Sequence, residues 1–138
     1  MGLPSAVEAR PFYRAGIRRL EDAEVLLLAK RTTGAVYMAG YTVECLMKAL
    51  IPANLAGAQR ENALRSFRGR RAHDLEWLRY YYRRHVGGSI PRDIARHLSR
   101  LASWSTDLRY ETTLVKRRFA DDFMASVSAI VTWADGRV

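Results

Sequence analysis

The densest cluster of cationic side chains in the sequence lies in a four-residue segment that also contains a glycine. Its three arginines are Arg68, Arg70 and Arg71. Guanidinium groups gathered in this way suit contact with phosphate, because each planar group can donate two hydrogen bonds to the oxygens of one anion. Alternatively, the segment is a solvated loop that binds nothing. The residue types alone leave these two interpretations open.

A second group of polar side chains recurs at helical spacing. Its members lie at intervals of 4, 3 and 4 residues, which predicts one polar and aromatic stripe on a helix. They are Tyr37, Tyr41, Glu44 and Lys48. Glu44 and Lys48 have the order that favours an intrahelical ion pair, worth about 0.3–0.5 kcal/mol on a surface. Tyr41, Glu44 and Lys48 are candidate binding residues, although a structural or subunit contact explains the same stripe.

The charge balance narrows the choice of partners. Lys and Arg number 23 against 14 Asp and Glu, a net charge of +9, which favours phosphate-rich partners or an acidic protein surface.

Glycine-rich phosphate loops and clusters of metal ligands are absent from the sequence, so we expect no cofactor and no metal. One cysteine, Cys45, allows neither an internal disulfide nor a cysteine-based zinc site. The longest uncharged runs have 12 residues, too few to span a membrane, and we expect a cytoplasmic protein.

Helices must position these side chains, because apolar residues recur every three or four positions along the whole chain. We predict an all-α fold, an up-and-down bundle of four main helices plus one short helix, in a single domain of residues 1–138. Breaks are predicted at residues 32–34, at Pro52, at residues 87–88 and over residues 105–113. Ser5 with Glu8 resembles a capping box for the first helix, and the helix before Ser105 is predicted to reach about Trp104.

Three short motifs resemble, in order and spacing, the signature of the HEPN domain family. They are Glu44-x-x-x-Lys48-Ala49, the helix start His73-Asp74-Leu75, and the turn Arg109-Tyr110 before the last helix. No single motif is specific, but together they span residues 12 to about 134. The resemblance implies a helical bundle, frequently dimeric, that is encoded beside small nucleotidyltransferases or acts in toxin–antitoxin and defence systems.

Many members of this family are metal-independent RNases built on Arg-x(4–6)-His. In such chemistry the imidazole moves a proton and the guanidinium holds the phosphate. Each histidine here has an arginine at that spacing, but about one such pair arises by chance when Arg fills 20 of 138 positions. Arg92 and His97 form the best pair and are the candidate catalytic residues. The favoured alternative is a solvated basic stripe of Arg92, Arg96 and Arg100 at i, i+4 spacing.

The branch of the family with His-Asp-Leu and Arg-Tyr often lacks the RNase motif, and nucleotide or nucleic-acid binding is its usual suggested role. The resemblance places Arg109 and Tyr110 near the phosphate-binding arginine of catalytic relatives. Asp107 and His73 complete the candidate binding residues. Alternatively, Arg109 pairs with Asp107 and fixes the turn, while Asp74 with His73 caps a helix.

The sequence thus predicts a HEPN-type protein that binds nucleotide, RNA or a nucleotidyltransferase partner. A metal-independent endoribonuclease and a pure protein-interaction subunit are the alternatives. We also predict a homodimer, because four large aromatic residues exceed what one bundle core accommodates. They are Trp77, Tyr81, Trp104 and Trp133.

Overall fold

A computed structural model describes residues 2–138, and within them only helices and connecting segments occur. The α-helices are α1 (Arg10–Leu28), α2 (Thr32–Ala53), α3 (Gly57–Ser66), α4 (Leu75–Tyr81), α5 (Arg92–Arg100) and α6 (Arg117–Asp135). Short 3₁₀ segments are η1 (Val7–Ala9), η2 (Arg70–His73) and η4 (Thr106–Tyr110), and η3 (Tyr82–Val86) is a π-helical turn. The all-α prediction is confirmed, but the count of four main helices plus one is approximate. Three helices are long, and the other three have ten residues or fewer.

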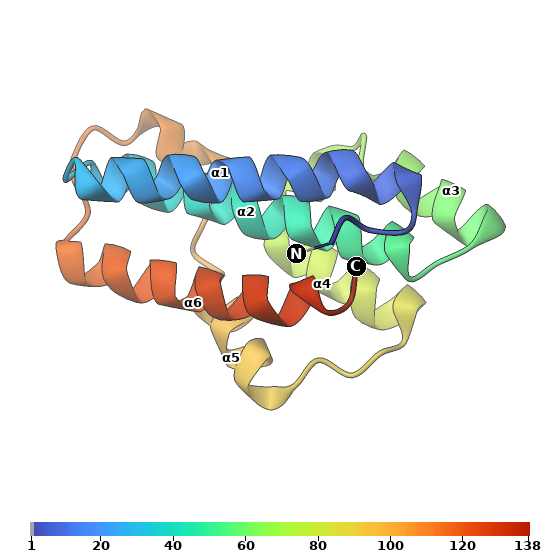
Figure 1. Cartoon of the computed structure of the whole chain (residues 1–138). Helices are drawn as coiled ribbons and strands as arrows, with labels where there is room; N and C mark the ends of the chain where they lie inside the picture. Colours follow the sequence, from blue (N-terminus) through green and yellow to red (C-terminus); the bar gives the residue numbers. More distant parts are fainter. Residues whose placement is uncertain (1) are drawn as a thin grey trace.

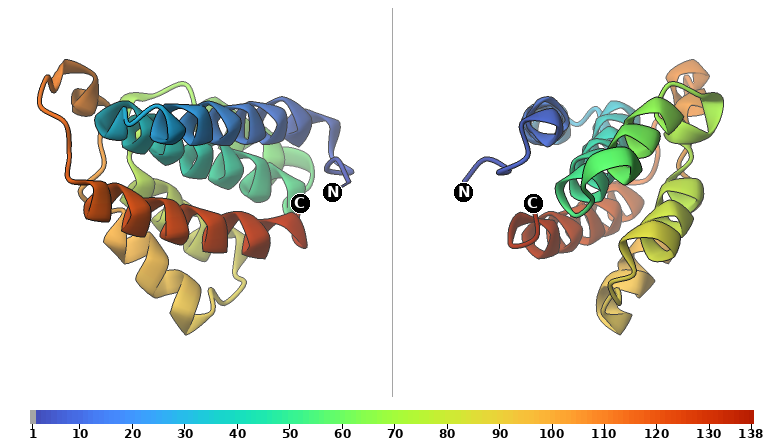
Figure 2. Two further views of the ribbon diagram at one scale, coloured as in Figure 1. Left: turned by 60° about the vertical axis from the view of Figure 1, so that its left-hand side comes forward. Right: turned by 90° about the vertical axis from the view of Figure 1, so that its right-hand side faces the viewer.

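The long helix α2 lies at the centre of the bundle. α1 runs antiparallel beside it, and α6 packs along it from another side (Figure 1). The shorter helices α4 and α5 cover the side of α2 and α6 that faces away from α1 (Figure 2). The short segments η2 and η4 carry most of the candidate binding residues, and both reach α2, η2 through the contact of His73 with Glu44 and η4 through its own packing on α2.

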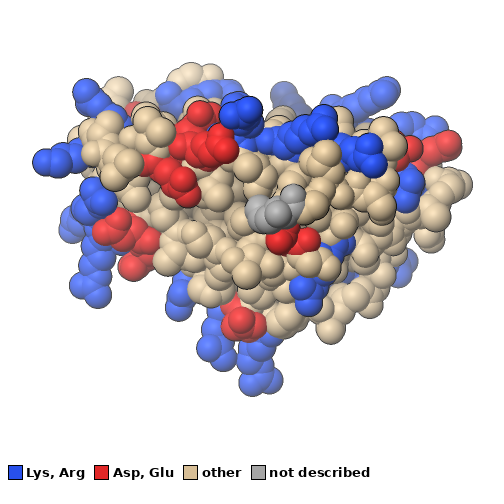
Figure 3. All heavy atoms as spheres, viewed as in Figure 1, with Lys and Arg blue, Asp and Glu red and all other residues tan. Residues whose placement is uncertain are grey.

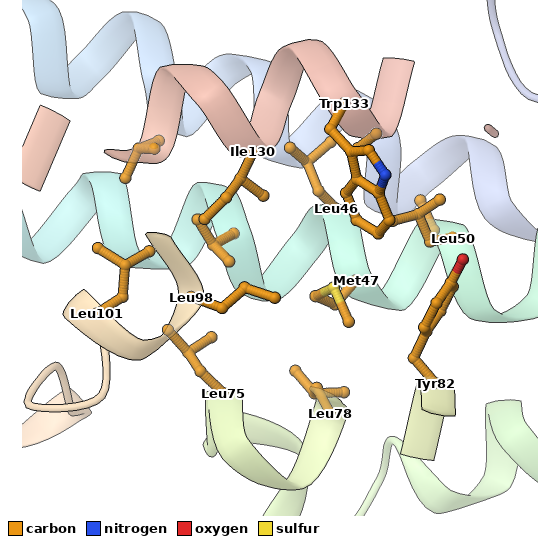
Figure 4. Close-up of a cluster of buried hydrophobic side chains, with 14 of the residues drawn as sticks. Leu46, Met47, Leu50, Leu75, Leu78, Tyr82, Leu98, Leu101, Ile130 and Trp133 are labelled. Carbon is orange, nitrogen blue, oxygen red and sulfur yellow. The ribbon is translucent and has the colours of Figure 1, made fainter. Parts of the chain in front are cut away.

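The core is built around the apolar stripe predicted for α2. All five predicted positions of that stripe are buried: Val36, Ala39, Val43, Met47 and Leu50. In the close-up, side chains of α2 meet leucines of α4 and α5 and the apolar face of α6 (Figure 4). Burial of this stripe fixes the rotation of α2, and with it the direction in which the polar stripe of the same helix points.

The predicted break at residues 32–34 is wrong, because α2 already begins at Thr32. The turn lies earlier, where Lys30 adopts a left-handed conformation with φ of 62°. Thr32 and Thr33 donate their hydroxyl hydrogens to the carbonyl oxygens of Val115 and Thr113, at 2.6 and 2.7 Å. These bonds join the first turn of α2 to a segment about 80 residues away, which local spacing could not reveal.

Two other predicted boundaries are also wrong. α1 begins at Arg10 without a side-chain cap, so Ser5 and Glu8 do not form the expected capping box. Instead, the Glu8 carboxylate lies 3.5 Å from the Arg60 guanidinium of α3. α5 ends at Arg100 rather than near Trp104, because the following turn carries Trp104 away from the helix and against α2.

The prediction that one bundle core cannot accommodate the four large aromatic residues is wrong. Tyr81, Trp104 and Trp133 are only 5–9% exposed, and Trp77 is half-buried. The layer formed by α4, α5 and η4 adds a second internal surface, which accommodates these rings within one chain. The prediction of a dimer therefore loses its support from these residues.

Candidate functional site

The two charged members of the polar stripe on α2 are buried, unlike an ordinary surface ion pair, whereas Tyr37 and Tyr41 are partly exposed. Glu44 and Lys48 are only 4% and 6% exposed, and Lys48 Nζ donates to Glu44 Oε2 at 3.0 Å. Lys48 Nζ also lies 6.0 Å from the centre of the Phe67 ring. A buried pair of this kind gives up the hydration of both charges, so each partner depends on the other for its place in the core.

His73 connects this buried pair to the surface. Its Nδ1 lies 3.1 Å from Glu44 Oε1, while 54% of its side chain stays exposed. Asp74 caps α4, as the sequence predicts, by accepting from the backbone N–H groups of Glu76 and Trp77 at 2.9 and 3.4 Å. The cap fixes the start of α4 and, with Glu44, the orientation of the imidazole. His73 Nε2 is then the ring atom left for a ligand.

Trp104 holds η4 against α2. Its indole packs on Gly40, where any Cβ would overlap the ring, and its Nε1 donates to the Tyr37 carbonyl oxygen at 3.1 Å. The Tyr41 ring meets the same indole edge-on, with centroids 5.1 Å apart, and the Tyr37 and Tyr41 hydroxyls are 3.2 Å apart. Burial, with this hydrogen bond second, raises the pKa of Tyr41 well above its usual value. Tyr41 therefore remains a neutral phenol that can donate a hydrogen bond.

The short helix η4 presents Arg109 to solvent. The Ser105 hydroxyl starts η4 by accepting from the Asp107 N–H at 3.2 Å. The Arg109 guanidinium lies 4.9 Å from the centre of the Tyr110 ring, and the phenols of Tyr110 and Tyr37 raise the pKa of Arg109. No ion pair joins Arg109 to Asp107 among the described residues, although the structural alternative for this turn requires one.

These elements enclose a surface hollow of about 620 Å³, which we call the Arg109 hollow. It is lined by Tyr41, Arg70, His73, Thr106, Asp107 and Arg109. Two guanidinium groups and an imidazole face a single carboxylate there, so the hollow favours an anion. The buried Glu44–Lys48 pair lies beneath the Arg109 hollow and contacts its lining residue His73.

The structure brings together five of the predicted binding residues and leaves the others outside. Arg68 and Arg71 are exposed near Arg70 but do not line the Arg109 hollow, and the Tyr110 ring is 72% exposed. Sequence reasoning missed Thr106, which lines the hollow, and Gly40, which makes room for Trp104. No sequence signal distinguished Thr106. The small residue inside an apolar helix was the available signal for Gly40.

The candidate catalytic pair lies elsewhere, on α5. Arg92 is exposed at the first position of α5, whereas His97 is partly buried, with Nδ1 3.0 Å from Ser126 Oγ of α6. Residues five apart on a helix point in directions roughly 140° apart. Neither side chain lines the Arg109 hollow.

The surface charge is not gathered on the face formed by α1 and α6. There, Lys and Arg side chains lie along α1 and around the outline, with Asp and Glu among them (Figure 3). Within residues 2–138 no group of three or more His, Cys, Asp or Glu side chains could hold a metal ion. No helix in the described part is both long and apolar enough to cross a membrane.

The geometry can be set beside comparisons with known proteins. Residues 9–137 match the family model of the HEPN domain. Comparisons with curated proteins and with solved structures give no match.

Proposed function

Because this chain belongs to the HEPN domain family, we propose that it binds the phosphate groups of a nucleotide or of RNA in the Arg109 hollow. The observation that carries the proposal is the convergence of Arg70 and His73 from η2 with Arg109 from η4 on one hollow. The setting we propose is a toxin–antitoxin or defence module, the context that the family resemblance implies.

The arrangement has the parts that a phosphate site needs. Arg109 and Arg70 are exposed and can each donate two hydrogen bonds to one anion. His73 is held at Nδ1 by Glu44, so a protonated imidazole would donate from Nε2 to a third oxygen. The Tyr41 phenol adds a neutral donor on the wall formed by α2. Asp107 is the one carboxylate in the lining and could accept from a ribose hydroxyl.

Glu44 and Lys48 are positioning residues in this proposal. Both are buried, so neither offers its charge to a ligand directly. Their role is to hold His73 in the orientation that faces the hollow. A nucleotidyltransferase partner would present its own acidic or nucleotide-bearing surface to the same cationic side chains, which is the interaction alternative.

The substitution Arg109→Lys tests the proposal, because lysine keeps the charge but loses the planar pair of donors. We expect ATP binding, measured by isothermal titration calorimetry, to weaken about tenfold or more at an unchanged melting temperature. Arg118→Lys, at an exposed position of α6, is the matched control and should bind as the original protein does. A lower melting temperature with ATP affinity preserved would instead show that Arg109 only fixes its turn.

The nuclease alternative has its own assay. If the chain is a metal-independent endoribonuclease, it will cut RNA in EDTA, and His97→Ala will abolish the cutting with the fold intact. Cutting that is lost in His73→Ala instead would assign the chemistry to the Arg109 hollow. A protein that neither cuts RNA nor binds ATP or RNA, yet binds a nucleotidyltransferase, would be an interaction subunit.

A further inference from the structure

A second basic surface lies on α4 and η3, away from the Arg109 hollow. It is a hollow of about 640 Å³ lined by Glu76, Arg79, Tyr80, Arg83 and Arg84. None of these residues lines the Arg109 hollow. Three arginines face one carboxylate, so the local charge is positive. α4 lies on the side of the bundle that faces away from α1 (Figure 2).

Ordinary helical spacing explains why so many arginines share this surface. Its lining residues follow one another at intervals of 3, 1, 3 and 1, which places them along one stripe of a helix. The π-helical turn begins after Tyr80, at Tyr82, and continues the helix to Val86. Tyr80 is 61% exposed, an unusual place for a large ring. It is flanked by guanidinium groups on the same surface.

Arg79 joins this surface to α5. Its side chain is only 18% exposed; Nη1 donates to Ser99 Oγ at 3.1 Å and lies 3.6 Å from Glu76 Oε1. Its Nε is buried without a hydrogen-bond partner. On α5, Arg96 lies three residues before Ser99, and Arg92 lies seven residues before it. Both arginines therefore share the helix face of Ser99. The contact between Arg79 and Ser99 thus links the arginines of α4 and η3 to those of α5. We call this set the α4–α5 face: Arg79, Tyr80, Arg83, Arg84, Arg92 and Arg96.

We propose that the α4–α5 face binds single-stranded nucleic acid, with its arginines on the phosphates and Tyr80 stacked on a base. A cationic surface alone would also attract an acidic protein. The exposed ring between arginines favours a nucleic acid, because every base offers a flat surface for stacking and unpaired bases are free to use it. The guanidinium groups can both contact phosphate and stack. This site is independent of the ligand of the Arg109 hollow.

Fluorescence anisotropy with a labelled 20-residue oligouridylate tests this proposal. Arg83→Gln/Arg84→Gln removes two phosphate contacts, and we expect weaker binding and a salt dependence reduced by about 1.4 in the log–log slope. The charge-matched control is Arg14→Gln/Arg118→Gln, at exposed positions of α1 and α6. It should change affinity less and leave the slope unchanged. Equal losses in both double variants would overturn the proposal.

The stacking role has a separate test. Tyr80→Ala should weaken oligouridylate binding about tenfold, whereas Tyr80→Phe keeps the ring and should bind within about twofold of the original protein. A 20-residue oligothymidylate distinguishes RNA from DNA, and binding of either supports the face as a single-strand site. Polyglutamate that binds as tightly, together with no effect of Tyr80→Ala, would assign the face to an acidic protein and overturn the proposal.

Failure of this proposal and failure of the proposed function can be told apart. Arg83→Gln/Arg84→Gln should lower oligouridylate affinity by the same factor in the original protein and in the Arg109→Lys background, because the two sites do not share residues. The same double variant should leave ATP binding unchanged. Oligouridylate binding that is lost in Arg109→Lys but kept in Arg83→Gln/Arg84→Gln would place the RNA in the Arg109 hollow alone and overturn the second site.

Discussion

Glu44 shows how one side chain can serve both the core and the surface. It is almost fully buried, yet it accepts from Lys48 on its own helix and contacts His73 of η2. The sequence predicts the Glu44–Lys48 pair from i, i+4 spacing but gives no sign that the pair is buried. On a surface the pair would contribute little to stability. Because it is buried, removing one partner alone leaves the other as an unpaired charge in the core, which is strongly destabilising.

Lys48→Met should therefore destabilise the fold strongly. It leaves Glu44 as a buried carboxylate with His73 as its remaining polar partner, and we expect the free energy of unfolding to fall by about 3–5 kcal/mol. Urea denaturation measures the change. Glu44→Gln/Lys48→Met, which removes both charges, should recover much of the loss. A Lys48→Met protein within about 0.5 kcal/mol of the original, the range of ordinary surface changes, would show that the pair is not buried in solution.

Cys45 gives a prediction for pH dependence. Burial first, and then the nearby Glu44 charge, raise the pKa of the Cys45 thiol to about 11. Because the thiolate is the reactive form, only about one thiol in a thousand is reactive at pH 8. Alkylation by iodoacetamide should therefore accelerate about tenfold for each pH unit between 8 and 10 in the folded protein. A rate that levels off near pH 9 would indicate an ordinary exposed thiol.

At the scale of elements, the contact between Trp104 and α2 positions η4 and thus Arg109. Gly40→Ala places a methyl group where the indole lies, so Trp104 must leave its site. We expect a loss of about 1–3 kcal/mol in stability, red-shifted tryptophan fluorescence and weaker ATP binding. Gly136→Ala, where a Cβ meets nothing within 4 Å, is the control. Unchanged fluorescence and binding in Gly40→Ala would contradict this role of Trp104.

Local sequence signals predicted the elements well and their junctions poorly. The apolar spacing of α2 and the Asp74 cap of α4 depend on neighbouring residues, and both are confirmed. The start of α2 at Thr32 depends on hydrogen bonds to residues about 80 positions away, and the place of Trp104 depends on Gly40 of another helix. Contacts of this kind leave no pattern in the chain near either partner.

The residues of the candidate site were likewise predicted only in part. The motif residues His73 and Arg109 were predicted through the family resemblance, and both line the Arg109 hollow. Thr106 was missed because nothing in its type or spacing marks it. The α4–α5 face was also missed as a unit, because a contact between Arg79 and Ser99, 20 residues apart in the chain, links its two parts.

For the whole molecule, the homodimer stays a prediction, now from exposed apolar residues as well as from the family. Leu28 and Val25 at the end of α1 are 83% and 65% exposed, and Leu114 is 54% exposed. The Thr33 hydroxyl donates to the Thr113 carbonyl oxygen and accepts from the Val115 N–H, which holds the segment of Leu114 near the start of α2. Light scattering should give about twice the chain mass of 15.7 kDa at micromolar concentration.

Leu28→Glu should shift that dimer toward the monomer, because it places a charge in an apolar contact. Val7→Glu is the control, since Val7 is 64% exposed in η1, at the opposite end of α1. A particle of 15.7 kDa for the original protein would refute the dimer. Equal effects of the two substitutions would refute this choice of surface.

The most direct test of the account is an NMR titration of the ¹⁵N-labelled protein with ATP. Of the three tryptophans, Trp104 has its indole N–H on the Tyr37 carbonyl oxygen and its ring on Tyr41, which lines the Arg109 hollow, whereas the Trp133 ring lies against Tyr82 of η3. We predict saturable shifts of the Trp104 indole signal and of the Arg109 and His73 amides, with the Trp133 indole signal unmoved. Saturable shifts that leave Trp104, Arg109 and His73 unmoved, or no shifts at millimolar ATP, would contradict a phosphate site in the Arg109 hollow.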